Sequence, residues 1–76
     1  MSNSVKKTDL DYIKAIAQSG SFLAASEVLH VSQPAISQYI SKIEQEQGIQ
    51  LFNRNVRPVT LTEAGRYYVK IEEEIE

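Results

Sequence analysis

The chain has 76 residues, of which 42% are hydrophobic, and it carries a net charge of −2 with one histidine and no cysteine. These values fit one small globular domain and exclude a disulfide framework, and they argue against a Cys- or His-based metal site. No apolar run approaches the roughly 18–20 residues that cross a bilayer, and the polar N-terminus lacks an apolar signal core. We therefore expect a cytoplasmic domain with no metal, no cofactor and no membrane partner.

Charge is unevenly distributed along the chain. The last five positions include four glutamates, whereas residues 1–70 carry eight basic and six acidic side chains. The body of the domain is therefore mildly basic, which is a weak indication of nucleic-acid binding. We interpret the terminal glutamates as the solvated face of a helix.

Two short helices are predicted in the first part of the chain, after a flexible N-terminus over residues 1–7. Thr8 or Asp9 can cap the first helix, whose apolar positions recur at helical spacing until the pattern stops at Gly20. Ser21 can cap the second helix. The apolar stripe of this second helix consists of Phe22, Ala25, Val28 and Leu29.

A third, longer helix is predicted between Ser32 and Gly48. Ser32 can act as its N-cap, Pro34 lies in the first turn where its missing N–H costs nothing, and Gly48 suits the C-cap. The buried stripe of this helix consists of Ile36, Ile40 and Ile43. Two short helices joined through the tight connection His30-Val31 indicate a helix-turn-helix.

The apolar period changes after the third helix. Apolar residues flank the basic, turn-rich segment 53–58, which predicts a two-stranded hairpin, and such a hairpin after a helix-turn-helix is called a wing. Thr62 is expected to cap a last helix that runs to the end of the chain. The predicted fold is therefore mainly α, with a winged helix-turn-helix over residues 8–61 and the start of a linker helix over residues 62–76.

The polar face of the third helix is the strongest candidate site. Its amide and hydroxyl groups can both donate and accept hydrogen bonds, as base edges in the major groove require. The face consists of Gln33, Pro34, Ser37, Gln38, Ser41 and Gln45. Pro34 offers an apolar contact for a thymine methyl, and Ser32 with the first helical N–H groups can hold a phosphate. An ordinary solvated helix face is the alternative.

Basic side chains surround the predicted hairpin. Arg54 and Arg57 lie at its tip, Lys42 lies on the preceding helix and Arg66 on the following one. Arginine on a projecting hairpin suits phosphate binding or insertion into the minor groove. The alternative is that these charges serve solubility and protect the strand edge from aggregation.

Several segments occur together at a characteristic spacing. They are Ser21-Phe22, the run Leu-His-Val-Ser-Gln-Pro-Ala-Ile-Ser at 29–37, Ile43-Glu44, Gly48, Leu51-Phe52, Arg54 and Leu-Thr-Glu-Ala-Gly at 61–65. The chain thereby resembles, over about residues 8–70, the N-terminal DNA-binding domain of LysR-type transcriptional regulators. The resemblance implies a winged helix-turn-helix and a linker helix that pairs two subunits. It also implies a small-molecule effector that binds only through a further domain, absent from this chain.

The resemblance also implies roles for individual residues. The recognition-helix contacts match Ser32, Gln33, Pro34 and Ser37, the wing contact matches Arg54, and a hydroxyl at the base of the wing matches Thr62. The sequence departs from the family pattern at Gln38, Tyr39 and Ser41, where arginine, glutamine and a basic residue are frequent. These departures remove positive charge from the helix and should lower its non-specific affinity for DNA.

The last helix carries Ala64, Tyr68, Ile71 and Ile75 at the spacing of a coiled-coil seam. We expect Ala64 to pack on the first helix. Tyr68, Ile71 and Ile75 are expected to lie beyond the compact body and to contact a second subunit.

Three further side chains receive structural interpretations. His30, in the turn, has no carboxylate or second histidine near it in the sequence and is expected to be structural or solvent-facing. Tyr12 is expected to border the core. For Tyr39 we favour packing on the first helix over contact with a phosphate.

The function predicted from these features is sequence-specific binding of double-stranded DNA by a bacterial LysR-type regulator, as a homodimer on an inverted repeat. The alternative is a winged-helix module that binds protein and not DNA, which the net charge of −2 and the uncharged third helix would suit. An enzyme is not expected, because no nucleophile–base pair or carboxylate pair stands in an apolar, pocket-like context.

Overall fold

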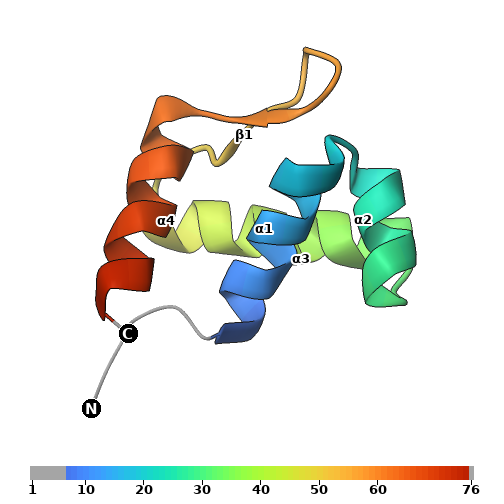
Figure 1. The fold of residues 1–76 in the computed structure, drawn as a ribbon, viewed down its shortest axis with the longest axis horizontal. Coiled ribbons are helices and arrows are strands. Elements are labelled where there is room, and N and C mark those ends of the chain that lie inside the picture. The colour runs from blue at the N-terminus through green and yellow to red at the C-terminus, as the bar shows by residue number, and fades with distance from the viewer. Residues whose placement is uncertain (1–6, 76) are drawn as a thin grey trace.

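The computed structural model describes residues 7–75, which form four helices and one hairpin. The elements in chain order are α1 (Lys7–Ser19), α2 (Phe22–Leu29), α3 (Gln33–Gln47), β1 (Phe52–Asn53), β2 (Thr60–Leu61) and α4 (Glu63–Ile75). In Figure 1, α1 crosses in front of α3, with α2 near one end of α3 and α4 near the other. This arrangement confirms the predicted winged helix-turn-helix with a further helix.

The start of α1 differs from the prediction. The helix begins at Lys7, so Thr8 and Asp9 lie inside its first turn and neither precedes it as a cap. The Asp9 carboxylate instead accepts a hydrogen bond from the hydroxyl of Tyr39 on α3. Lys7 therefore belongs to a helix and not to the predicted flexible N-terminus, whose remaining residues lie outside the described part of the chain.

The caps of α2 and α3 are as predicted. The Ser21 hydroxyl accepts the N–H of Ala24 at 3.0 Å, and the Ser32 hydroxyl accepts the N–H of Ala35 at 3.2 Å. Gly48 ends α3 with a φ of 69°, a left-handed conformation that glycine adopts without strain. These local bonds satisfy backbone groups that the ends of a helix leave unpaired.

The turn between α2 and α3 depends on His30. This residue takes the left-handed conformation, with a φ of 61°, at the C-cap of α2, and its side chain is exposed. The structural or solvent-facing role expected for His30 fits this geometry.

The core lies where α1, α2 and α3 meet, and it extends under the wing. The stripe predicted on α3 is confirmed, because Ile36, Ile40 and Ile43 are all buried. Further buried side chains come from α1, α2, β1, α4 and the segments that flank the two strands: Leu10, Ile13, Ile16, Ala25, Leu51, Phe52, Val59 and Tyr68. One continuous core therefore fixes the wing relative to the helix-turn-helix.

The apolar stripe predicted on α2 is wrong at one position. Val28 is 67% exposed, whereas Ala25 and Ser26 are buried. The Ser26 hydroxyl donates to the Leu23 carbonyl at 2.6 Å, which satisfies a polar group that burial would otherwise penalise. An eight-residue helix presents only a narrow face to its neighbours, and here that face contains Ser26 in place of Val28.

The wing, residues 52–61, is a short antiparallel hairpin. Phe52 pairs with Leu61 and Asn53 with Thr60, so each strand is shorter than the apolar residues suggested. The side chain of Phe52 is 2% exposed and anchors the hairpin in the core. The N–H of Val59 donates to the Gly20 carbonyl at 2.8 Å and ties the wing to the turn between α1 and α2.

The last helix packs differently from the prediction. Thr62 caps α4 as expected, since its hydroxyl accepts the N–H of Gly65 at 2.8 Å. Tyr68, however, is only 8% exposed and belongs to the core, so it does not lie beyond the compact body as predicted. Ala64 is exposed and does not pack on α1, and Ile71 is half-buried. The side chain of Ile75 lies outside the described residues.

The close approach of α4 to the wing explains why α4 turns Tyr68, and not Ala64, toward the core. A Cβ at Gly65 would collide with the carbonyl oxygen of Leu51, so the helix backbone lies directly against the chain that enters the wing. This contact turns the face of α4 that contains Tyr68 toward the core. In the part of the chain that the structure describes, no helix is both long enough and apolar enough to cross a membrane.

Candidate nucleic-acid interface

The polar face of α3, which we call the reading face, consists of Gln33, Pro34, Ser37, Gln38, Ser41 and Gln45. All of these residues are exposed except Ser37, which is half-buried. Because the caps and the isoleucine stripe hold the helix, the reading face is not needed for folding. Its amide and hydroxyl groups can therefore be used for contacts with another molecule.

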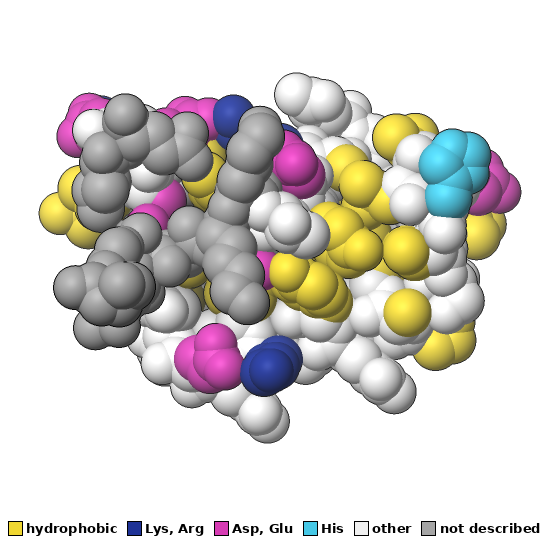
Figure 2. Space-filling model, turned by 90° about the horizontal axis from the view of Figure 1, so that it is seen from below, with side chains coloured by type: hydrophobic (Ala, Val, Ile, Leu, Met, Phe, Trp, Pro, Cys, Tyr) yellow, Lys and Arg dark blue, Asp and Glu magenta, His cyan; other side chains and the backbone are white. Residues whose placement is uncertain are grey.

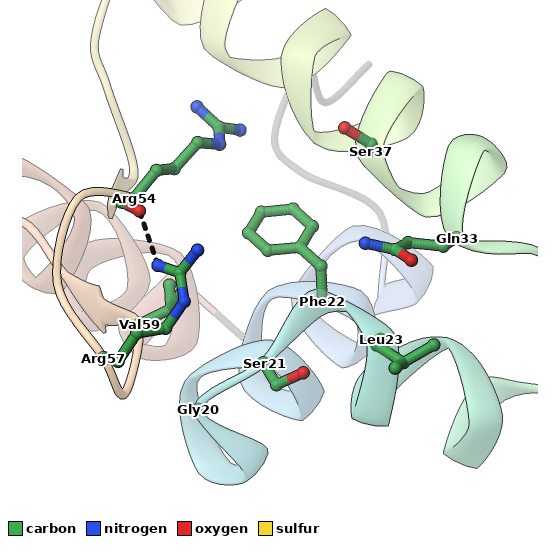
Figure 3. Close-up of a pocket in the computed structure, with 9 residues that line it drawn as sticks. All are labelled: Gly20, Ser21, Phe22, Leu23, Gln33, Ser37, Arg54, Arg57 and Val59. Carbon is green, nitrogen blue, oxygen red and sulfur yellow. Dashed lines mark hydrogen bonds between the residues drawn. The ribbon is translucent and has the colours of Figure 1, made fainter.

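A cleft of about 390 Å³ opens between the start of α3, the start of α2 and the wing. Its lining includes Gln33 and Ser37 from the reading face and both wing arginines. Figure 3 shows the two arginines on one side of this cleft and Gln33 with Ser37 on the other, with the ring of Phe22 between them. We call it the wing cleft. It brings the helix and wing candidates of the sequence together.

The two wing arginines are held by protein groups. The Arg54 guanidinium donates from Nη1 to Oε1 of Glu44 at 3.1 Å, and its central carbon lies 5.2 Å from the centre of the Phe22 ring. Arg57 donates from Nη1 to the carbonyls of Arg54, at 2.7 Å, and Val56, at 3.0 Å. Arg57 therefore braces the turn at the tip of the wing, and Arg54 links the wing to α3.

The remaining basic candidate on α3 lies apart from the wing cleft. Lys42 lines a separate pocket with Asp9, Tyr39 and Glu46, on the side of α3 that faces α1. Lys42 is therefore not part of the wing cleft and cannot act together with the two arginines at one atom. Ser41 and Gln45 line a third, shallow pocket near the C-terminal end of α3.

Thr62 is occupied by structural bonds. Its hydroxyl donates to the Gln50 carbonyl at 2.5 Å and accepts the N–H of Gly65 at 2.8 Å. A phosphate would need the hydroxyl hydrogen that the Gln50 carbonyl already holds. The geometry therefore favours a capping role for Thr62 over direct contact with a phosphate.

Tyr39 makes its contacts within the protein. Its ring stacks on that of Tyr12, with centroids 4.3 Å apart and planes inclined by 28°, and its hydroxyl bonds to Asp9. Burial and then the hydrogen bond to Asp9 raise the pKa of Tyr39. The expected packing of Tyr39 on the first helix is thus confirmed.

Positive charge is dispersed on the face of the molecule that lies opposite the wing (Figure 2). Figure 2 shows the face turned away from the wing, where lysine and arginine side chains among the described residues are scattered and form no continuous patch. The described residues contain no group of three or more histidine and acidic side chains suited to a metal ion. The wing cleft and the reading face are the best candidates for contact with an anionic partner.

Comparison with known proteins agrees with this geometry. Residues 8–66 match the model of the bacterial regulatory helix-turn-helix proteins of the LysR family. The chain belongs to the LysR family. It is 44% identical, over 66 residues, to the HTH-type transcriptional regulator YcgK of Bacillus subtilis (strain 168), and this match covers 87% of the chain but 20% of YcgK. It is also 44% identical, over 59 residues, to the regulator CatR of Pseudomonas putida, covering 78% of the chain and 20% of CatR. The chain thus spans about a fifth of the length of these relatives.

Solved structures of LysR-family DNA-binding domains share the fold. The BenM DNA-binding domain, crystallised with benA site 1 DNA, has a TM-score of 0.83 and 32% identity, over 93% of this chain and 80% of that one. The CbnR DNA-binding domain, crystallised with DNA, has a TM-score of 0.80 and 34% identity, over 93% of this chain and 82% of that one. This LysR-family chain therefore has the fold of the DNA-binding domain, and its family is one of transcriptional regulators and not of enzymes.

Sequence reasoning missed two residues of this LysR-family site. Glu44 and Phe22 were part of the resemblance, but neither received a role in the site. Glu44 holds Arg54 across the junction between α3 and the wing, and Phe22 lies under the same guanidinium. The available signal was charge complementarity between Glu44 and the basic segment 53–58, which follows after a short connection.

Proposed function

We propose that this domain binds double-stranded DNA sequence-specifically, as the DNA-binding part of a cytoplasmic LysR-type transcriptional regulator with no catalytic role. The observation that carries the proposal is the wing cleft, where Gln33 and Ser37 face two arginines. Neutral donors and acceptors suit base edges, whereas arginine suits phosphates, and a duplex presents both along one surface.

In the proposed complex, α3 lies in the major groove with its N-terminal end against the bases. Gln33 can form two hydrogen bonds to adenine, and Pro34 can contact a thymine methyl. Ser37, Gln38 and Ser41 extend the reading face along the groove. We expect Ser32 and Lys42 to contact phosphates on the flanks, and the wing with Arg54 and Arg57 to reach the adjacent backbone.

A salt titration distinguishes this function from the alternative of a protein-binding winged helix. The affinity of the domain for a random duplex should fall with added salt, with a log–log slope of about −0.9 for each phosphate neutralised. We expect a shallow slope, because the domain brings few basic side chains to the site. Absence of duplex binding at low salt, or affinity indifferent to salt, would favour the protein-binding module.

We further propose that α4 pairs two copies of the chain, with a seam that differs from the one the sequence suggested. Ala64 and Tyr67 are exposed, Tyr67 at 67%, and Ile71 is half-buried. With Ile49 they line an apolar groove of about 240 Å³ between the end of α3 and α4. A second copy of α4 on this groove would place two α3 helices on an inverted repeat, whole helical turns apart.

Sedimentation of an Ile71→Asp variant tests the pairing, because a charge in an apolar seam should leave the chain monomeric. Lys70→Asp is the matched control, since it introduces the same side chain at an exposed position of α4 outside the groove. A dimer that survives in Ile71→Asp would show that the subunits pair elsewhere. In the whole regulator, a separate domain would bind the small-molecule effector.

A further inference from the structure

One side chain joins α3 to the wing. Oε2 of Glu44 accepts the N–H of Leu51 at 2.7 Å, and Oε1 accepts Nη1 of Arg54 at 3.1 Å. The backbone carbonyl of the same residue accepts the N–H groups of Gly48, at 2.8 Å, and Ile49, at 3.2 Å. Glu44 thus contacts the end of α3, the chain that enters the wing and an arginine within the wing.

The Arg54 guanidinium is held from a second direction. Its central carbon lies 5.2 Å from the centre of the Phe22 ring, which itself packs edge-on against Phe52 in the core. An arginine over an aromatic face is stabilised by the negative potential of the ring. Two independent contacts, one from α3 and one from α2, therefore restrict the same side chain.

We propose that Glu44 is a positioning residue for DNA binding, which holds Arg54 so that the unused edge of its guanidinium faces the duplex. The inference rests on the proposed DNA-binding function. A guanidinium has five N–H donors in a rigid plane, and within the described residues its hydrogen bond to the protein uses Nη1. The Arg54 side chain remains 38% exposed, whereas that of Glu44 is 11% exposed. The carboxylate is thus on the protein side of the pair and the guanidinium on the solvent side.

We expect the Arg54 guanidinium to bind Glu44 and a DNA phosphate at the same time, and not to exchange Glu44 for the phosphate. If Arg54 left Glu44 for a phosphate, a largely buried carboxylate would lose its compensating charge, which is costly. Binding a phosphate on the other edge keeps both contacts. It also avoids freezing a long, rotatable side chain at the moment of binding, since the protein already restricts it.

Loss of the Glu44 charge should change the affinity for DNA in opposite directions under the two explanations, charge repulsion alone and positioning of Arg54. Removing a carboxylate beside DNA should strengthen binding, because the repulsion of phosphates falls. If Glu44 positions Arg54, removing the charge should weaken binding, because the arginine must then be ordered by the DNA. The sign of the change therefore decides between the two.

The experiment compares Glu44→Gln with Glu46→Gln, on a duplex enriched by the wild-type chain from a random pool. Glutamine can still accept the N–H of Leu51, while Glu46 is exposed on the same helix and contacts neither Arg54 nor Leu51. We expect about threefold weaker binding for Glu44→Gln, the scale of one partly exposed ion pair, and unchanged or tighter binding for Glu46→Gln. In an Arg54→Ala background, Glu44→Gln should no longer weaken binding and should behave like Glu46→Gln, unchanged or tighter.

Equal or tighter binding by a folded Glu44→Gln variant would overturn the inference, as would the same loss in the Arg54→Ala background. Both results presuppose that the wild-type chain binds the duplex. If the wild-type chain binds no duplex, the proposed function itself fails, and the two failures are thereby distinguished.

A second variant tests the inference should Glu44→Gln fail to fold. Arg54→Lys retains the charge and one bond to Glu44 but lacks the planar fork that can serve two partners. Its affinity should fall nearly as far as that of Arg54→Ala, about fivefold on the same scale. Binding by Arg54→Lys at the wild-type level would show that a point charge suffices and would overturn the inference.

Discussion

The reading face of α3 and the wing use their polar side chains in opposite ways. Within the described residues, Gln33 and Ser37 make no side-chain hydrogen bond to the protein, whereas both wing arginines bond inside it. The helix thus offers uncommitted neutral groups, and the wing offers charge that is already held in place. Uncommitted groups suit the reading of base edges, and fixed charge suits the placement of the protein on the phosphate backbone.

The difference follows from how each element is stabilised. The helix α3 has fifteen residues, caps at both ends and a buried isoleucine stripe, so the side chains on its outer face are not needed to stabilise it. Each strand of the wing has two residues, and so short a hairpin is not stable by itself. It needs Phe52 in the core and the bonds of Glu44, Arg54 and Arg57, and the two arginines are also the side chains proposed to contact DNA.

The largest expected effect concerns a residue of the reading face. Gln33→Ala should weaken binding to the cognate duplex by about 1–3 kcal/mol, because two hydrogen bonds to one base are lost. Affinity for random DNA should hardly change, since no charge is removed. Fluorescence anisotropy on both duplexes measures this, and an equal loss on the two would show that Gln33 does not read a base.

The stability of the domain should depend on the close contact between α4 and the chain that enters the wing. Gly65→Ala improves the helix propensity of α4 but drives a Cβ into the Leu51 carbonyl, and the steric term should win, with a net loss of about 1–2 kcal/mol in the free energy of unfolding. Urea denaturation measures this loss. Ala64→Ser, at the exposed neighbouring position, should change stability by less than about 0.5 kcal/mol. A Gly65→Ala variant as stable as the wild type would mean that α4 can move away from the wing at little cost.

Removal of the wing charge should act on all sequences alike. Arg54→Ala should weaken cognate and random binding by about 1 kcal/mol and reduce the salt slope by about one, since one phosphate contact is lost. Affinities at several salt concentrations test this. A loss confined to one base position, with the slope unchanged, would assign Arg54 to reading and remove the contrast with the helix.

The smallest effect concerns stability in alkali. Burial raises the pKa of Tyr68 to about 12, with Glu72 adding to the shift, and burial with the Asp9 bond raises the pKa of Tyr39. An unfolded tyrosine titrates near pH 10, so this stabilisation is complete below about pH 10 and is lost as the pH rises above it. Tyr39→Phe should cost about 0.5–1 kcal/mol at neutral pH and flatten part of the alkaline loss. Chemical denaturation at pH 7 and above pH 10 measures both effects, with Tyr67→Phe as the exposed control. An alkaline profile unchanged in Tyr39→Phe would contradict this account.

Local signals in the sequence were sufficient for most of the fold. Ser21, Ser32, Gly48 and Thr62 act within a few residues of themselves, so their capping roles could be predicted from type and position. The buried stripe of α3 follows from helical periodicity in the same way. The last helix, predicted after Thr62, is present as α4, whereas the pairing role that the family resemblance added to it stays a prediction.

Contacts between distant segments could not be predicted in the same way. Asp9 bonds to Tyr39 thirty positions away, which moves it from a capping role to a contact between α1 and α3. The rotation of α4, which buries Tyr68, depends on the approach of Gly65 to Leu51. Glu44 holds Arg54 only because the chain reverses at Gly48, so the internal use of the wing arginine appears in the fold and not in the pattern.

The central claim is that the reading face selects DNA sequence while the wing fixes the position of the domain. Selection of bound duplexes from a random pool tests it most directly, with the wild type and Gln33→Ala side by side. The account predicts an enriched motif for the wild type and a motif relaxed at one base pair for the variant. The same motif from both chains, or no enrichment by the wild type, would contradict it.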